Sequence, residues 1–477
     1  LDMYTKIKIK PVLDPAFLPA SVWNRSYQHL VDSVSAFQPF AIALERPDGL
    51  RTVYHTRILP PYSVFIGLNR KYVGRLVKFW LWATGGSKIY LCGSYPELTE
   101  SIAHAYAPSG SRQFDNEVIG QQIFDSPIKV VAVEYGQTPE PVTRPIPLGR
   151  HLDGCRIGFD LGGSDRKCAA LIDGKVVHAE EVPWDPYFQT NVEYHLAGIR
   201  DSLKRAAAHL PRVDAIGGSS AGVYVNNQVR VASLFRGIDK DSFQQHVQDI
   251  FLHLRKEWNN VPFEVVNDGD VTALAGSMSL NDSGVLGLAM GTSEATGYVD
   301  LNGHITPNLS ELAFAPVDYQ LNGPIDEWSG DRGCGVQYFS QQAVARLAPA
   351  AGIPFPADMP FPEQLEAVQA LMAQDDPRAR SIYQTIGTYL GYTLPHYAAF
   401  YDIKHLLILG RVTSGEGGEI IIDEAQQVLQ AEFPECAEKI NIRTPNEQVK
   451  RHGQAIAAAS LPRLDQEGLS IDTAQSA

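Results

Sequence analysis

The stretch that decides the fold is CRIGFDLGGSDRK, residues 155–167. Its apolar part ends in Asp160, a Gly-Gly-Ser turn follows, and the next β-like run reaches the hairpin signal Asp173-Gly174. This pattern predicts two antiparallel strands joined by a glycine turn. Because glycines let the backbone approach a ligand closely, the N–H groups of such a turn can bind an anion. An aspartate at the end of the strand can hold Mg²⁺ against phosphate oxygens. An ordinary hairpin has the same local sequence, so this stretch alone leaves both interpretations open.

Downstream of this turn, apolar runs alternate with amphipathic segments. Helical spacing of apolar residues predicts helices over 192–210, 243–258, 362–402 and 449–460. Short apolar runs predict strands over 213–216, 263–266, 284–289 and 406–409. Strands joined by crossover helices predict an α/β fold with parallel strands. Ligands in such sheets bind beyond the carboxyl ends of the strands, where polar or glycine-rich turns follow these runs, so we expect the turns to form one site.

The first 150 residues have an α/β pattern of their own. Strands are expected over 6–12, 40–45, 52–58, 88–92 and 128–134, with a helix over 95–106. The proline-rich segment 137–147 is typical of a linker. We therefore expect a separate N-terminal α/β domain over 1–150. Its role is open among a dimerisation module, a cap over a substrate cleft and a second ligand-binding domain.

The composition excludes some classes of function. The 54 acidic residues outnumber the 40 basic ones, for a net charge of −14 in 477 residues, which argues against nucleic acid as the main partner. The five cysteines are scattered and form no Cys-x-x-Cys pair, which favours a reduced cytoplasmic compartment. No apolar run approaches the ~18 residues of a membrane helix. We expect a cytoplasmic protein without membrane contact.

Four motifs in order produce a family resemblance. They are the turn at 160–164 with Lys167, NDGDVTAL at 267–274, MGTS at 290–293 with Gly297, and LGRV at 409–412 with the glycines that follow. In this order they resemble the phosphate, catalytic and adenosine motifs of the ROK family, which groups repressors, unassigned reading frames and sugar kinases. This family lies within the actin–hexokinase–acetate kinase superfamily of ATPases. The resemblance covers residues 151–477.

The resemblance implies an architecture and an activity. It implies two ribonuclease-H-like (actin-like ATPase) lobes with a cleft between them, in addition to the N-terminal α/β domain. Lobe I would cover 151–283, with the C-terminal helix 449–462 packing back on it, and lobe II would cover 284–448. The implied reaction is phosphoryl transfer from ATP, with Mg²⁺, to a hydroxyl of a sugar or polyol.

The resemblance also implies roles for particular residues. Asp268 would be the general base, and Asn267 and Glu311 would contact the substrate. Asp160 would position Mg²⁺ through a bound water molecule. The residues expected to bind ATP are Asp160, Gly162, Gly163, Ser164, Lys167, Gly291, Thr292, Gly410 and Arg411.

The chain departs from the family pattern at two places. In the second phosphate motif, residues 293–296 replace most of the glycines, and Glu294 adds a negative charge near the expected phosphates. In ROK sugar kinases a histidine and three cysteines bind a structural zinc. Here Phe314 stands at the histidine position and Cys334 is a single thiol, so we expect no zinc site.

Two other functions stay open on the same fold. One is a sugar-sensing regulator that does not transfer phosphate, and the other is an ATPase that drives a partner protein. Binding of Mg-ATP distinguishes the first from a kinase, and ATP hydrolysis without an acceptor would favour the second. A homodimer is the family-based expectation for the oligomeric state.

Overall fold

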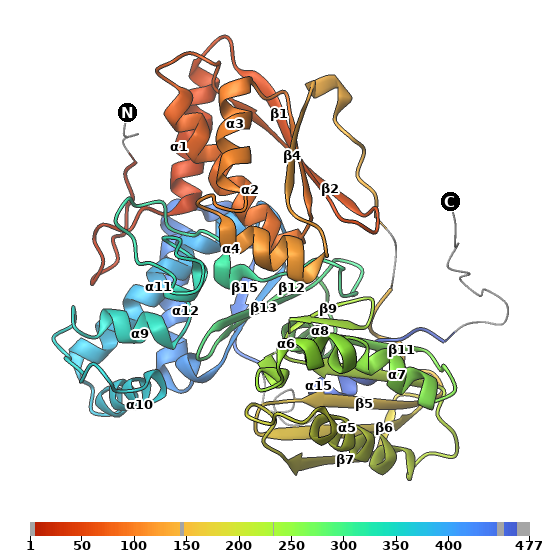
Figure 1. Cartoon of the computed structure of the whole chain (residues 1–477). Helices are drawn as coiled ribbons and strands as arrows, with labels where there is room; N and C mark the ends of the chain where they lie inside the picture. Colours follow the sequence, from red (N-terminus) through yellow and green to blue (C-terminus); the bar gives the residue numbers. More distant parts are fainter. Residues whose placement is uncertain (1–4, 144–146, 232, 446–452, 465–477) are drawn as a thin grey trace. The chain divides into compact units, whose positions relative to one another are not determined.

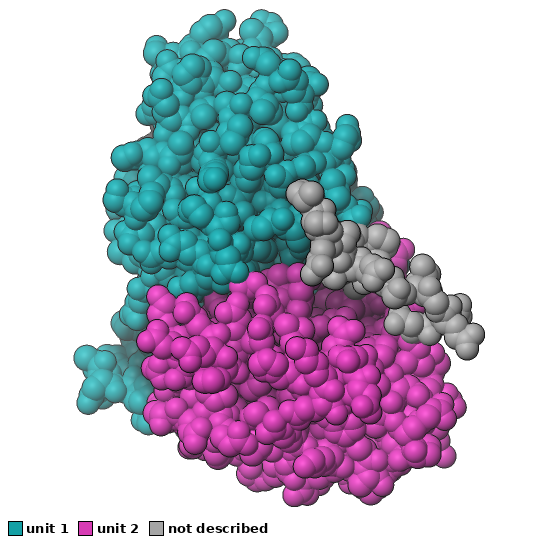
Figure 2. Space-filling model, turned by 45° about the vertical axis from the view of Figure 1, so that its right-hand side comes forward, with its two compact units in different colours: residues 1–145, 284–300, 307–445 teal, residues 146–283, 301–306, 446–477 magenta. Residues whose placement is uncertain are grey.

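The computed structural model of the protein describes residues 5–143, 147–231, 233–445 and 453–464. The chain forms two compact units (Figure 2). Unit 1 comprises residues 1–145, 284–300 and 307–445, and unit 2 comprises residues 146–283, 301–306 and 446–477. Among the helices of the described ranges, none combines the length and the hydropathy that a bilayer crossing requires.

Unit 2 is built on a five-stranded sheet with the order β11-β8-β5-β6-β7 (Figure 1). Its strands are β5 (Cys155–Leu161), β6 (Asp165–Ile172), β7 (Lys175–Pro183), β8 (Ala215–Ser220) and β11 (Phe263–Asn267). β5, β6 and β7 are antiparallel, and Asp173 and Gly174 adopt positive φ values of 47° and 78° at the second turn, as the hairpin signal predicts. β5, β8 and β11 run parallel to one another.

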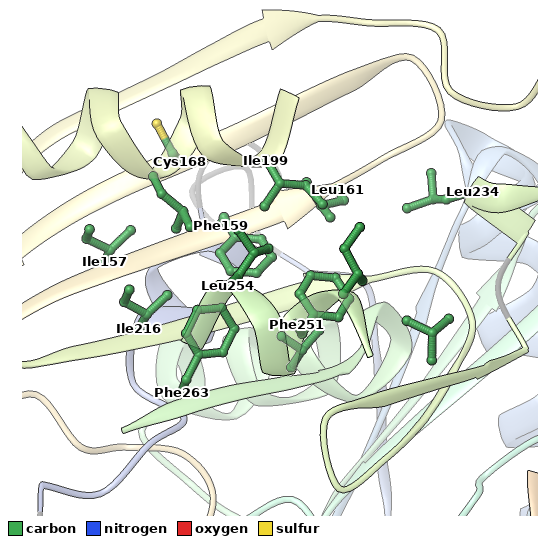
Figure 3. Close-up of a cluster of buried hydrophobic side chains, with 14 of the residues drawn as sticks. Ile157, Phe159, Leu161, Cys168, Ile199, Ile216, Leu234, Phe251, Leu254 and Phe263 are labelled. Carbon is green, nitrogen blue, oxygen red and sulfur yellow. The ribbon is translucent and has the colours of Figure 1, made fainter. Parts of the chain in front are cut away.

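Helices cover one face of this sheet, and an apolar core lies between them and the strands. The remaining elements of unit 2 are α5 (Val192–Ala207), β9 (Val223–Val225), β10 (Gln228–Val231), α6 (Lys240–Ser242), α7 (Ile250–Glu257), α8 (Asp268–Leu280) and α15 (Gly453–Ala459). Figure 3 shows Phe159 of β5 beside Ile199 of α5 and Phe251 of α7. Alternation along β5 sends Ile157, Phe159 and Leu161 into the same core, so Gly158 and Asp160 face the other side.

On that other side, α15 packs directly on glycines. A Cβ atom on Gly158 would lie 1.7 Å from the carbonyl oxygen of Ala455, and one on Gly217 would lie 1.7 Å from that of Ala458. The glycine-rich turn expected after the strand predicted over 213–216 is therefore wrong at its start. β8 continues to Ser220, because Gly217 makes room for a helix backbone and does not bend the chain. Of the C-terminal helix predicted over 449–460, residues 449–452 lie outside the described residues.

Unit 1 contains two four-stranded sheets. The first has the order β2-β1-β3-β4 and the second β13-β12-β14-β15. The strands of the first are β1 (Gln38–Glu45), β2 (Arg51–Ile58), β3 (Lys88–Cys92) and β4 (Lys129–Val133). The strands of the second are β12 (Val285–Met290), β13 (Glu294–Val299), β14 (His405–Leu409) and β15 (Asn441–Arg443). In the second sheet β12, β14 and β15 are parallel and β13 is antiparallel, so the glycine turns after β12 and β14 lie at the same edge.

Helices of unit 1 come from both ends of its sequence. The N-terminal ones are α1 (Ala20–Ser33), α2 (Ile66–Thr84), α3 (Pro96–Ala105) and α4 (Gln113–Asp115), which continues as a π-helix over Asn116–Ile123. The later ones are α9 (Gln341–Leu347), α10 (Phe361–Met372), α11 (Pro377–Tyr397), α12 (Glu416–Glu432) and α13 (Pro434–Lys439). The helices predicted over 95–106 and 362–402 correspond to α3 and to α10 with α11.

The N-terminal residues share the core of unit 1. Phe17 packs on Tyr389 of α11 with ring centroids 4.7 Å apart, and Phe79 of α2 packs on Phe400 at 4.3 Å. The structure thus groups the N-terminal segment with residues 284–445 and differs from the separate domain expected over 1–150. The physical reason is that the aromatic side chains of this segment bury themselves against α11 and the residues that follow it.

The strand predicted over 6–12 is wrong for a related reason. The backbone N–H groups of Lys8, Ile9 and Leu13 donate to side chains, which belong to Glu432, Tyr392 and Thr385 respectively. This segment therefore lies against α11 and α12, where side-chain acceptors take the place of a neighbouring strand.

Candidate functional site

Asp160 ends β5 beside a hydroxyl group of the neighbouring strand. In the parallel pair of β5 and β8, Asp160 lies opposite Ser219, whose Oγ donates a hydrogen bond to Asp160 Oδ1 at 2.6 Å. The carboxyl is buried, and this burial raises its pKa to about 6, although the Ser219 hydroxyl lowers it. At neutral pH the group is therefore a poorly hydrated carboxylate, which suits contact with a cation.

Asn267 and Asp268 join β11 to α8. Asn267 is the N-cap of the helix, and its Oδ1 accepts the N–H of Gly269 at 2.7 Å. Its Nδ2 donates to the carbonyl oxygen of Gly222 at 2.6 Å, so both polar ends of the carboxamide have partners within unit 2. Because Asn267 supplies the cap, the helix does not need Asp268 for that purpose. The predicted contact of Asn267 with a substrate stays a prediction.

Asp268 lies at the first position of α8. Its Oδ1 accepts the N–H of Gly269 at 3.0 Å, and burial raises the pKa of this half-buried carboxyl. The negative charge of Asp268 in turn raises the pKa of Asp160. Since Ser220 of β8 pairs with Asn267 of β11, the two acidic residues lie at the same edge of one sheet, although 108 positions separate them in the numbering of the chain.

The glycine turn after β5 is held by two aromatic side chains. Gly162 donates its N–H to the carbonyl of Asp165 at 2.9 Å and accepts the indole N–H of Trp184 at 2.8 Å. A Cβ atom on Gly163 would lie 2.1 Å from the hydroxyl of Tyr187, so only glycine fits beneath that ring. The N–H of Gly162 is therefore already hydrogen-bonded within the turn. A turn that binds an anion through its backbone would leave this N–H free for the ligand.

Ser164 and Lys167 both contact Asp165. The exposed Ser164 donates its hydroxyl to Asp165 Oδ2 at 2.9 Å, and Lys167 Nζ lies 3.4 Å from Asp165 Oδ1. Lys167 pairs with Asp160 across β5 and β6, and its charge lowers the pKa of Asp160. A hydroxyl and an ammonium group therefore accompany this turn, and their contact with phosphate stays a prediction.

In unit 1 the motifs at 290–293 and 409–412 meet. Gly291 turns the chain from β12 to β13, donates to the carbonyl of Ser293 at 3.0 Å and is followed by Thr292. Gly410 ends β14 with φ at +95°, and a Cβ atom there would lie 2.6 Å from the carbonyl oxygen of Met290. Gly410 is therefore required both by its backbone conformation and by its packing against β12.

Glu294 lies in the interior of unit 1. Its side chain is buried, a Cβ atom on Gly335 would lie 2.3 Å from its Oε2, and the hydroxyl of Tyr397 donates to Oε1 at 3.4 Å. Burial, and to a smaller extent the charge of Glu311, raise its pKa to about 8, although the Tyr397 hydroxyl lowers it. At neutral pH the carboxyl is therefore mostly protonated and places little negative charge beside the Gly291 turn.

The remaining two predicted residues also have protein contacts. Glu311 is half-buried and donates its backbone N–H to the carbonyl oxygen of Trp82 at 3.0 Å. Arg411 is paired through Nη2 with Glu366 Oε1 at 2.5 Å, and its carbonyl accepts the side chain of Gln369 at 2.8 Å. The guanidinium of Arg411 is thus directed to α10.

The residues at the family's zinc positions do not fit a zinc ion. Phe314 packs on Trp82 and Phe114, with ring centroids 4.5 and 5.2 Å apart. Burial raises the pKa of the Cys334 thiol to about 12, which disfavours the thiolate that a metal needs. Its sulfur lies 3.8 Å from Asp331 Oδ2. Within the described part of the chain, no three His, Cys, Asp or Glu side chains form a group able to hold a metal.

Sequence patterns did not reveal several partners of these residues. Ser219 lies in a glycine-rich segment whose sequence predicts a turn and not a strand. Its position just before the carboxyl end of a parallel strand is nevertheless a signal for a residue near the site. Tyr187 and Tyr397 lie far from their partners in the sequence and carry no motif.

Comparison with known proteins supports the fold. No protein-family model matches the sequence, and no curated protein matches it. Among solved structures, a ROK hexokinase from Thermus thermophilus superposes with a TM-score of 0.51 and 19% identity, covering 65% of this chain and 97% of that one. A ROK-family transcriptional regulator, a homologue of the E. coli MLC protein, has a TM-score of 0.50 and 19% identity, covering 65% of this chain and 79% of that one.

The sheet orders and these superpositions define the class of protein. The chain has the two-lobed actin-like ATPase fold, which confirms the predicted fold class. Within that class its fold is that of the ROK family, which includes both kinases and regulators.

Proposed function

We propose that the protein transfers a phosphoryl group from ATP to a hydroxyl of a sugar or polyol. The observation that carries this proposal is the pair of carboxyls at one sheet edge, Asp160 held by Ser219 and Asp268 at the start of α8. Each has a raised pKa, and such perturbed pairs are typical of catalytic sites.

The two carboxyls would have different roles. Asp268 would accept the proton of the attacking hydroxyl while the acceptor oxygen bonds to the γ-phosphorus and the bond to the ADP oxygen breaks. Asp160, as a buried carboxylate, fits a Mg²⁺ ion that neutralises phosphate charge when bound. Asn267 and Glu311 are proposed acceptor contacts.

The proposed nucleotide contacts are Gly162, Gly163, Ser164, Lys167, Gly291, Thr292, Gly410 and Arg411. The absence of a side chain at Gly291, where a Cβ atom would meet only the carbonyl oxygen of Ser293 at 3.5 Å, supports close backbone approach to a ligand. The buried, protonated state of Glu294 supports the use of an anionic substrate despite the altered motif.

A screen of sugars and polyols with Mg-ATP tests the proposal. With the best acceptor, Asp268→Asn should lower kcat by ~10²-fold or more, because the amide cannot accept the proton. Asp241→Asn, at an exposed position of α6 in the same unit, is the matched control. Turnover within a few-fold of wild type in a folded Asp268→Asn variant would show that another group is the base.

A sugar-sensing regulator is the second candidate. It is favoured by the occupied N–H of Gly162 and by the two internal hydrogen bonds of the Asn267 carboxamide. A sensor would be stabilised against heat by a sugar alone, whereas a kinase would also be stabilised by Mg-ADP.

We also propose a cytoplasmic location and a homodimer. The free state of all five cysteines accords with the cytoplasmic location.

A further inference from the structure

The end of α2 holds the backbone on both sides of the Ser310–Glu311 peptide bond. The carbonyl oxygen of Ala83 accepts the N–H of Ser310 at 2.9 Å, and that of Trp82 accepts the N–H of Glu311 at 3.0 Å. Carbonyls in the last turn of a helix have no partner within the helix, so an external donor is needed there. The helix end is thus satisfied by the residue proposed to contact the acceptor.

Aromatic packing strengthens this contact. The ring of Phe314, three residues after Glu311, lies against Trp82 of α2 and Phe114 of α4. Trp82 and Phe114 also stack on each other at 6.0 Å. Such pairs contribute about 0.5–1.5 kcal/mol each beyond the area that they bury, so the loop is held by rings as well as by the backbone.

We refer to residues 310–334 as the loop after β13. A buried charge cluster holds the later part of this loop at Asp331. Asp331 Oδ2 lies 2.7 Å from Arg75 Nη1, 2.6 Å from Arg112 Nη1 and 3.2 Å from Lys78 Nζ. These three cations hold the pKa of Asp331 well below its usual range. All three come from the N-terminal segment, so that segment neutralises the charge of Asp331.

The cluster is connected to the end of α2. Lys78 Nζ also lies 3.4 Å from Asp115 Oδ1, and the same oxygen accepts the indole N–H of Trp82 at 3.0 Å. Asp331, Lys78, Asp115 and Trp82 therefore form one continuous network that ends at the backbone of Glu311. We refer to it as the α2 network; its members are Arg75, Lys78, Trp82, Arg112, Asp115 and Asp331.

We propose that the α2 network positions Glu311 and that the N-terminal segment thereby holds the loop that zinc would hold in the related kinases. At the positions where the family resemblance implies zinc ligands, Phe314 and Cys334 contact Trp82 and Asp331 of this network. The inference rests on the proposed function for the role of Glu311, but the holding of the loop does not depend on it. Trp82 and Asp331 are positioning residues in this scheme.

Two substitutions test the network. Trp82→Phe removes the N–H donor to Asp115 and keeps an aromatic ring, and Asp331→Asn removes the charge that three buried cations share. Each should raise the KM for the acceptor by about tenfold with a smaller change in the KM for ATP, because a displaced Glu311 affects the acceptor only. Asp331→Glu, which keeps the charge, should recover part of the loss. Arg57→Gln, which breaks an exposed ion pair with Asp32 in the same segment, is the control.

Amide hydrogen exchange gives a readout that does not depend on turnover. Peptides covering residues 308–316 should exchange faster in Trp82→Phe and Asp331→Asn than in wild type and in Arg57→Gln. If Asp331→Asn does not fold, Trp82→Phe decides. Faster exchange without turnover in the wild type would support the network and refute the proposed function. Unchanged exchange, an equal loss for both substrates, or stoichiometric zinc in the purified protein would overturn the network.

Discussion

Asp160 in unit 2 and Glu294 in unit 1 are both buried carboxyls beside a glycine turn, but their partners differ. Asp160 accepts a short hydrogen bond from Ser219 at 2.6 Å and has a pKa of about 6, whereas Glu294 accepts a long one from Tyr397 at 3.4 Å and has a pKa of about 8. Near pH 7 the first is therefore largely charged and the second largely neutral. Burial alone does not decide the role of an acidic residue, since the donors around it determine its charge.

The largest expected effect is on kcat and distinguishes Asp160 from Glu294. Asp160→Asn should lower kcat with Mg-ATP by ~10²–10³-fold, because a neutral amide cannot stabilise the charge that a carboxylate does. Glu294→Gln should keep turnover within a few-fold, since that side chain is already mostly neutral. Steady-state kinetics with the acceptor found by screening measures both, and equal losses would show that Glu294 acts in the reaction.

The second effect is on stability and its dependence on pH. Glu294 keeps its proton in the folded chain up to about pH 8, whereas an ordinary glutamate loses it near 4.5. The folded state therefore binds the extra proton between these values, and the free energy of unfolding falls as pH rises through this window.

In Glu294→Gln the free energy of unfolding should fall by a few kcal/mol less over this window, because the side chain no longer titrates. The stability of the variant relative to wild type should therefore increase as pH rises from 5 to 8. Denaturant unfolding of both proteins at several pH values measures the difference. Parallel stability curves would mean that Glu294 is ionised in the folded protein.

The third effect concerns the two glycines near Glu294. Gly410→Ala should destabilise the protein by about 1–3 kcal/mol, because its φ is positive and its Cβ would meet the backbone of Met290. Gly291→Ala is the matched control, since its Cβ would meet only the carbonyl oxygen of Ser293 at 3.5 Å. Thermal unfolding in unit 1 distinguishes them, and similar melting temperatures for both variants would contradict the packing.

The smallest effect tests the donors themselves. Ser219→Ala removes the hydrogen bond that lowers the pKa of Asp160, so the acid limb of the pH–rate profile should move upward from about pH 6. A neutral hydrogen bond of ~1 kcal/mol corresponds to somewhat less than one pH unit. Tyr397→Phe, which removes the weaker donor to Glu294, should leave this profile unchanged. An unmoved limb in Ser219→Ala would show that a different group titrates there.

Local patterns predicted much of the fold. β3 occupies the predicted residues 88–92, and the Asp173-Gly174 hairpin forms as its residue types require. These features depend on period-2 alternation and on glycine at positive φ, which neighbouring residues determine. The motif order also indicated the fold, because each motif ends a strand of a sheet whose topology allows few arrangements.

The partners of the same residues depend on distant segments. Glu294 keeps its proton because it is buried in a core to which Gly335 and Tyr397 belong. Asp331 is charged because three cations of the N-terminal segment surround it. No spacing in the sequence predicts such contacts, since residues far apart in the chain make them.

The sequence by itself determined the strand and helix types, the order of the motifs and the presence of two acidic residues after parallel strands. Only the tertiary structure decided which carboxyls are charged, which glycines serve packing and that the N-terminal segment shares a core with residues 284–445. The physical reason is that secondary structure follows from short-range backbone and side-chain preferences. Burial and pKa depend on the sum of all neighbours in space, and folding brings these neighbours together from every part of the chain.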